Sequence, residues 1–142
     1  MKRFLFSLMI ATPAIATAET VLLDIGALPT RPVYDVAELT PLALTADGAP
    51  AMLLLSLDAG DVVPPHATES GLRMLTVLSG EMSWGDGDEV NEGAERTYGP
   101  GSILAVRAGD MHWVAARRGP VQIQLVLLDD ETPVPGIQEQ LQ

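Results

Sequence analysis

Short apolar runs separated by turn residues dominate the pattern of hydrophobic and polar positions along the chain. The runs at 51–57 and 72–80 are compact, and each ends in a turn that contains glycine. The run at 121–128 partly alternates between apolar and polar residues, as a half-buried strand does. Short strands with turns about every 8–12 residues predict an all-β chain, folded as a sandwich or a small barrel.

The remaining segments are less regular. Residues 21–25 are expected to form an edge strand, followed by a wandering connection that contains several prolines. Residues 81–84 are expected to return as the second arm of a hairpin, and 96–116 to form three short strands divided by glycine-containing turns. Residues 129–142 are expected to form a polar tail.

The N-terminus has the features of an export signal in the usual order. Lys2 and Arg3 precede a short apolar run, and Ala16-Thr17-Ala18 is a small-residue cleavage pattern. The apolar run is too short to span a bilayer as a helix. We therefore expect a signal peptide at 1–18, a single domain at 19–142, and a periplasmic or secreted protein. An uncleaved anchor or an amphipathic helix is the alternative.

Composition and charge narrow the class of partner. The chain has 142 residues, which suits one domain, and it has no cysteine, so that disulfides and thiolate ligands are excluded. Removing the signal leaves six arginines against nineteen acidic residues, a formal charge of −13. Such a surface repels phosphate backbones and anionic lipids. We expect a small-molecule ligand, with no nucleic acid and no membrane as partner.

The only two histidines of the chain, His66 and His112, lie in separate glycine-containing stretches. Histidine is the commonest metal ligand and the usual proton shuttle near neutral pH. A jelly-roll barrel can bring distant strands together around its mouth, so the two imidazoles could form one site. A lone histidine beside a turn is more often a surface or core residue, and this alternative stays open.

Both histidine stretches resemble the sequence motifs of the cupin superfamily. Residues 60–80, "GDVVPPHATESGLRMLTVLSG", follow G-x5-H-x-H-x3-4-E-x6-G at both glycines and at His66. Residues 101–116, "GSILAVRAGDMHWVAA", follow G-x5-P-x-G-x2-H-x3-N at both glycines and at His112. The resemblance implies a small jelly-roll barrel, and a homodimer is expected from the resemblance only.

Four other motif positions differ from the family pattern. They are Thr68 for the second His, Arg73 for the Glu, Arg107 for the Pro and Ala116 for the Asn. In the family, the histidines and the Glu usually bind a divalent metal. Only two of those ligands are present here, and a guanidinium beside the site would repel a cation.

One hypothesis is a metal-dependent enzyme like those of the superfamily, an oxygenase, isomerase or decarboxylase. Glu69 could join His66 and His112 in a two-His, one-carboxylate set for Fe, Zn, Mn or Ni. Strand alternation opposes this set, because Glu69 points outward if His66 points inward. Methionines near the histidines are candidate soft ligands for Cu. The protein could equally bind no metal.

The other hypothesis uses Arg73 as a ligand-binding group. With His66 and His112 it could hold a small polar or anionic molecule in the barrel mouth, and Trp84 and Trp113 could wall the pocket. We favour this function over the enzyme, while leaving enzyme status open.

Simpler roles are also open for these residues. Arg73 could form a structural ion pair with Glu69 or Glu81. The tryptophans could be ordinary packing, and the barrel could be a degenerate structural or dimer-forming module.

Overall fold

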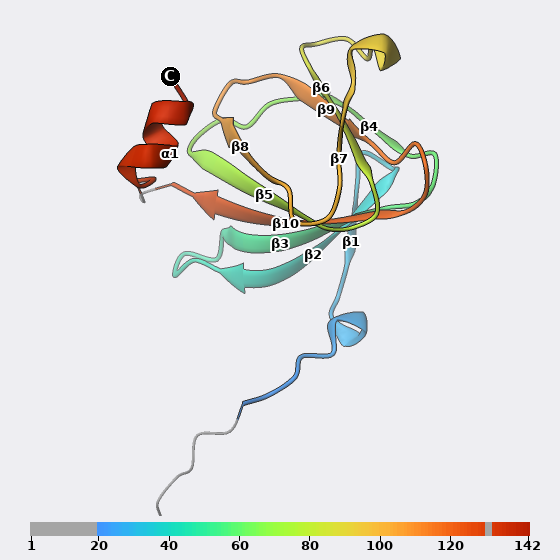
Figure 1. Ribbon diagram of the computed structural model, residues 1–142. Helices are drawn as coiled ribbons and strands as arrows, with labels where there is room; N and C mark the ends of the chain where they lie inside the picture. The colour runs from blue at the N-terminus through green and yellow to red at the C-terminus, as the bar shows by residue number, and fades with distance from the viewer. Residues whose placement is uncertain (1–19, 130–131) are drawn as a thin grey trace, which may run out of the picture.

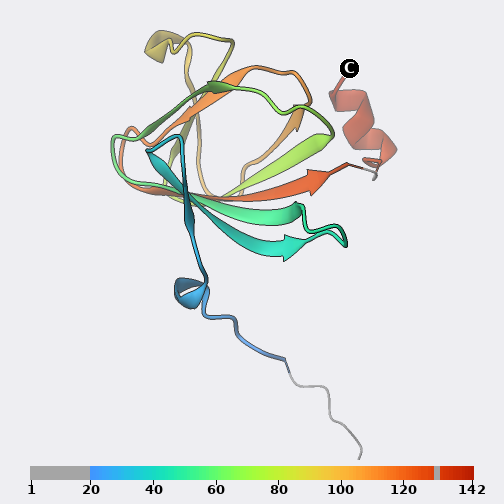
Figure 2. The ribbon, with the colours of Figure 1, turned by 180° about the vertical axis from the view of Figure 1, so that it is seen from behind.

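Two antiparallel sheets face each other and curve into a barrel in the computed structural model, which describes residues 20–129 and 132–142 (Figures 1 and 2). The expected signal peptide lies outside the described residues. None of the helices in these ranges has the length and apolar character needed to cross a bilayer.

The larger sheet has six strands, and the smaller sheet has four. The larger runs in the order β1 (Arg31–Val33), β2 (Ala37–Leu44), β3 (Pro50–Leu57), β10 (Val121–Leu128), β5 (Leu72–Ser79) and β8 (Ile103–Arg107). The smaller runs in the order β4 (Val62–His66), β9 (His112–Ala115), β6 (Met82–Asp86) and β7 (Arg96–Tyr98). Short helices are η1 (Ile25–Ala27), η2 (Glu92–Ala94) and α1 (Pro135–Gln140). The predicted all-β class is confirmed.

Most strands lie where the sequence pattern predicts them, and the exceptions have physical causes. The expected edge strand at 21–25 is wrong, because this segment has no strand and leads into η1, away from the barrel (Figure 1). The expected wandering connection contains strand β2. Pro41 lies inside β2, where the register with β3 shifts between Pro41 and Ala43, and such an irregularity accommodates a residue that lacks an amide hydrogen. The polar tail contains helix α1.

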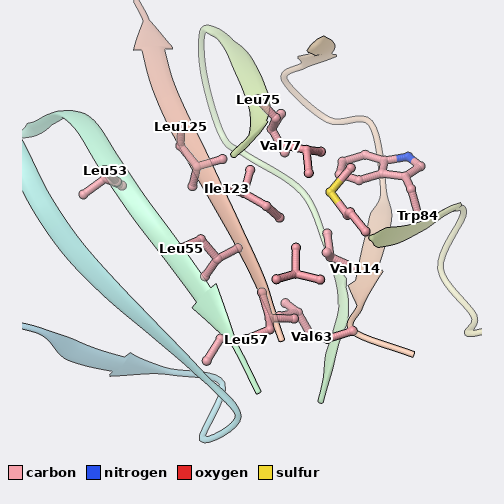
Figure 3. Packing of buried hydrophobic residues seen from close by; sticks show 14 of the residues in the cluster. Leu53, Leu55, Leu57, Val63, Leu75, Val77, Trp84, Val114, Ile123 and Leu125 are labelled. Atoms are coloured by element: carbon pink, nitrogen blue, oxygen red, sulfur yellow. The ribbon is translucent and has the colours of Figure 1, made fainter. Parts of the chain in front are cut away.

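The core lies between the two sheets, where side chains from both inner faces interdigitate. Figure 3 shows leucines of β3 and β10 opposite Val63, Trp84 and Val114 of the smaller sheet. All are buried. Alternate residues of each strand therefore face inward, so the inward direction of any one residue fixes that of its neighbours two positions away.

Trp113 packs on the opposite face of the smaller sheet from Val114. It is paired with Gly85 of β6, and it is only 1% exposed. Its Nε1 donates a hydrogen bond to Oε1 of Glu95 at 3.1 Å, and Arg117 donates to the same carboxylate at 2.6 Å. The bond from Arg117 lowers the pKa of Glu95, with a smaller contribution from Trp113. This unit pins the register of β9 against β6.

Replacing Gly85 with alanine should lower the free energy of unfolding by about 2–3 kcal/mol. The new methyl group would lie 1.9–2.3 Å from atoms of the Trp113 ring, so the ring would have to leave its position. Chemical denaturation followed by tryptophan fluorescence measures the effect. Gly99→Ala is the matched control, because an added Cβ there meets nothing within 4 Å, and it should change stability by less than about 0.5 kcal/mol. Equal stabilities of the two variants would contradict the role given to this packing.

Candidate functional site

The two histidines meet on the inner side of the smaller sheet. His66 is the last residue of β4 and His112 the first of β9, and the two are directly paired across these strands. Their ring centroids are 4.4 Å apart, with an angle of 56° between the ring planes. The expectation that two imidazoles 46 positions apart in the chain form one cluster is therefore confirmed.

Both imidazoles are held in the same tautomer by the backbone. Nδ1 of His66 lies 2.9 Å from the carbonyl oxygen of Pro64, and Nδ1 of His112 lies 2.8 Å from that of Asp110. A carbonyl oxygen can only accept, so Nδ1 carries the proton and donates in each ring. In the neutral imidazoles this leaves the Nε2 lone pair of both rings for other groups.

Burial lowers the pKa of both histidines, because it disfavours the charged imidazolium. The positive charge of Arg73 lowers the pKa of each ring further. For His112, the neighbouring His66 also lowers the pKa, and the carboxylate of Asp86 partly opposes the shift. The pair is therefore neutral at neutral pH.

Arg73 is a half-buried cation on β5, close enough to both histidines to affect their titration. Burial lowers its pKa, and Tyr34 and Asp129 act in the opposite direction. Among the described residues, no carboxylate lies within 4.0 Å of its guanidinium. The alternative of an ion pair with Glu69 or Glu81 is therefore wrong.

Glu81 instead pairs with Arg118 at 2.8 Å. Within the part of the chain that the structure describes, the half-buried guanidinium of Arg73 makes no ion pair, although the charge of Asp129 acts on it from farther away.

A cavity of about 310 Å³ opens beside this cation. Its polar lining residues are Arg31, Tyr34, His66 and Arg73, and leucines from β2, β3 and β10 form most of the rest. Among the residues that the structure describes, no aspartate or glutamate lines it. The cavity therefore combines a positively charged, hydrogen-bonding rim with an apolar wall, as small-molecule sites commonly do.

Tyr34 is a site residue that the sequence analysis missed. It lies in the turn between β1 and β2, where Tyr34 and Asp35 have φ values of 54° and 57°. This left-handed conformation costs roughly 1–2 kcal/mol for each non-glycine residue. The turn places the phenol ring 5.1 Å from His66, centroid to centroid. Recognising the β1–β2 hairpin in the sequence would have pointed to it.

The two candidate tryptophans lie on opposite faces of the smaller sheet. Trp84 stacks on His112, with centroids 4.5 Å apart and ring planes 10° apart, and its Nε1 donates to Asp86 at 2.8 Å. Trp84 and His112 both line a neighbouring hollow of about 210 Å³. Trp113 faces away from the histidines and packs over Gly85, so the structure does not bring it to the site.

Glu69 and Thr68 lie beside Arg73 rather than between the histidines. Glu69 is exposed, and with Thr68 and Arg73 it lines a separate hollow of about 330 Å³. The Thr68 hydroxyl has no hydrogen-bond partner, although the residue is only 5% exposed.

These residues do not fit a divalent metal. Within residues 20–129 and 132–142, no group of three His, Cys, Asp or Glu side chains is placed to hold an ion. The set of His66, Glu69 and His112 is therefore not assembled. The groups at the two replaced ligand positions, Arg73 and Thr68, supply hydrogen-bond donors, which suit an anion better than a cation.

Comparisons with known proteins give structural relatives only. No protein-family model matches the chain, and no curated protein matches it significantly. Many solved structures resemble it. The three described next match with a probability of 1.00.

The descriptions of three of these structures name an enzyme or an iron(II) form. The polyketide cyclase RemF from Streptomyces resistomycificus superposes with a TM-score of 0.61 and 16% identity, over 87% of this chain and 94% of that one. A sugar phosphate isomerase from a cupin superfamily, from Silicibacter pomeroyi, superposes with a TM-score of 0.58 and 20% identity, over 80% of this chain and 77% of that one. The iron(II) form of HppE superposes with a TM-score of 0.60 and 20% identity, over 77% of this chain and 60% of that one.

At these identities the likeness establishes the architecture and leaves the chemistry of the site to its own residues. The resemblance inferred from the two histidine motifs agrees with it. The opposed sheets, the paired histidines and the solved structures together show that this chain has the cupin fold.

Proposed function

We propose that this protein is an exported cupin-fold domain that binds a small organic anion in the mouth of its barrel. The observation that carries the proposal is Arg73, a half-buried guanidinium that has no carboxylate partner among the described residues and lines a cavity without acidic groups. Export rests on the signal features of residues 1–18.

The charge distribution supports an anionic ligand. The mature chain carries a formal charge of −13, yet the cavity beside Arg73 has two arginines and no acid in its lining. A larger hollow of about 390 Å³ has the opposite character, with four acidic residues and no basic one: Asp35, Glu38, Asp58 and Asp61. Positive charge has therefore been concentrated at the barrel mouth of an acidic protein, where it can attract an anion.

An anionic ligand would compensate Arg73 for hydration that it loses on burial. Burial removes part of the water that solvates the guanidinium. The charge of Asp129 offsets part of this loss, but no carboxylate of the described residues lies within 4.0 Å to form a direct ion pair. A ligand carboxylate can accept two parallel hydrogen bonds from it, which is the strongest neutralising contact available to arginine. Binding would convert an unpaired buried charge into a paired one.

A metal-dependent enzyme is the second candidate, and the pinned imidazoles favour it. Metal-bound histidines usually donate their other ring nitrogen to a carbonyl or carboxylate, as Nδ1 of His66 and His112 does here. Arg73 and the missing third ligand count against it. Some structural neighbours are enzymes by description, which leaves enzyme status open.

Small carboxylates such as phenylacetate should raise the melting temperature of the mature protein, and Arg73→Met should abolish the effect. At about 100 times the Kd, binding adds about 2.7 kcal/mol, or a shift of several degrees for a domain of this size. Differential scanning fluorimetry at constant ionic strength measures the shift. Arg118→Met is the matched control, since it removes a surface arginine that pairs with Glu81. The same shift in both variants would refute the assignment of Arg73.

Both histidines should titrate below the ordinary value of about 6.5 for an unfolded chain, because burial lowers the pKa of each. NMR titration of the ring carbons measures this. Arg73→Met should raise both pKa values, since the guanidinium charge lowers them. Unchanged values in that variant would show that Arg73 lies too far away to act.

The same shifts make stability depend on pH. Since the folded-state pKa of each ring is depressed, its contribution is complete above about pH 6.5 and is lost as the pH falls through the folded value. Replacing His66 with glutamine should flatten this part of the stability profile, as measured by urea denaturation at several pH values. A profile identical to wild type would contradict the depressed pKa of His66.

Metal analysis separates the two candidate functions. Tag-free protein purified without chelators should contain far less than one metal ion per chain, because Arg73 and the missing third ligand disfavour a cation. Inductively coupled plasma mass spectrometry gives the content. Stoichiometric metal that disappears in His112→Ala would favour the enzyme over the anion-binding domain.

A further inference from the structure

Arg73 and His66 present two different kinds of hydrogen-bonding group to a ligand, and Arg31 and Tyr34 complete the polar rim of the cavity. Arg73 offers only donors, whereas neutral His66 offers only an acceptor, because its Nδ1 proton is already given to Pro64. No described group donates to Nε2 of His66. A ligand that satisfies both residues must therefore carry an anionic acceptor and, near it, a hydrogen-bond donor.

A simple carboxylate would satisfy only the first of these groups. Its oxygens pair with the guanidinium, but they would face the lone pair of the His66 Nε2 atom with a second lone pair. A hydroxyl group close to the carboxylate removes the conflict, since it donates to the imidazole while the carboxylate accepts from Arg73.

The apolar lining residues of the cavity indicate the chemistry of the remaining part of the ligand, beyond its anionic group. Beyond the rim its wall is made of leucines, chiefly Leu39, Leu53, Leu55 and Leu125. These side chains favour an apolar body, because they offer no hydrogen bond to a second polar group. The volume of about 310 Å³ equals roughly ten waters of bulk liquid at about 30 Å³ each, which suits a ligand of about ten non-hydrogen atoms.

We infer that the site binds a 2-hydroxy monocarboxylic acid with an apolar side chain, its carboxylate on Arg73 and its hydroxyl donating to Nε2 of His66. The inference rests on the proposed anion-binding function and adds the ligand class. Imidazoles pinned in one tautomer make the site selective for the hydroxyl donor. His112 lies behind His66, stacked on Trp84, and supports the ring without sharing this cavity wall.

The test compares ligands that differ by one group. Isothermal titration calorimetry at pH 7.5 on the mature chain would use mandelate, phenylacetate, which lacks the hydroxyl, and α-methoxyphenylacetate (the methyl ether of mandelate), which keeps the oxygen but cannot donate. The pair 2-hydroxyhexanoate and hexanoate covers an aliphatic body. In each series we expect the hydroxy acid to bind about 10- to 100-fold more tightly than its analogues, because the analogues leave a buried acceptor unpaired.

Variants of His66 attribute the discrimination to one atom. His66→Phe should reduce the ratio of the mandelate affinity to the phenylacetate affinity to about one, because the acceptor is gone. His66→Gln should restore part of the preference through its amide oxygen. Circular dichroism and melting temperature would confirm that both variants fold, and the ratio of affinities within one variant is insensitive to modest changes of stability.

The outcomes distinguish this inference from the function on which it rests. Equal binding of mandelate and phenylacetate, lost in Arg73→Met, would overturn the hydroxy-acid assignment and leave the anion site standing. Equal binding of mandelate and the methoxy acid, or a preference that persists in His66→Phe, would overturn the role of His66. Failure of every acid to bind would overturn both proposals.

Discussion

The packing of Trp113 over Gly85 is the constraint on which the rest of the site depends. Side chains alternate between the two faces of a strand, so the outward position of Trp113 sends His112 and Val114 inward. A slip of β9 by one residue would reverse every one of these directions. The indole fits only where Gly85 leaves space, and its bond to Glu95 closes the outer side. The packing contact of Trp113 on the outer face of the smaller sheet thus fixes the inward orientation of the His112 imidazole.

The pairing of His66 with His112 follows from that register, and Arg73 then decides what the pair can do. Two neutral imidazoles with free Nε2 atoms are suitable metal ligands, but a carboxylate is needed to complete a set and to offset the ion's charge. Burial lowers the pKa of both imidazoles, and the guanidinium, whose charge is opposite to that of a carboxylate, lowers it further. Under the proposed function, Arg73 would donate to an anion and His66 would accept a hydrogen bond, while His112 contacts the His66 ring from outside the cavity.

Several features at the barrel mouth cost stability. Tyr34 and Asp35 occupy a left-handed turn. Within residues 20–129 and 132–142, the buried Thr68 hydroxyl has no hydrogen-bond partner and the half-buried Arg73 makes no ion pair. Each would be removed easily by substitution if stability alone mattered. Tyr34 and Arg73 line the same cavity, and Thr68 lines a neighbouring hollow together with Arg73. Local strain and unpaired polar groups of this kind are often found at binding sites.

Local sequence was sufficient for the β class, for most strands and for the residues of the cluster, because alternation, turn glycines and motif spacing are short-range signals. It missed β2, whose proline is tolerated only through an irregular pairing with β3, and therefore also Tyr34. Tertiary structure alone decided which tryptophan reaches the histidines, that Glu69 does not, and that Arg73 forms no ion pair with any acidic residue of the described ranges. Those outcomes depend on register and on distances between strands far apart in the chain, which no local pattern encodes.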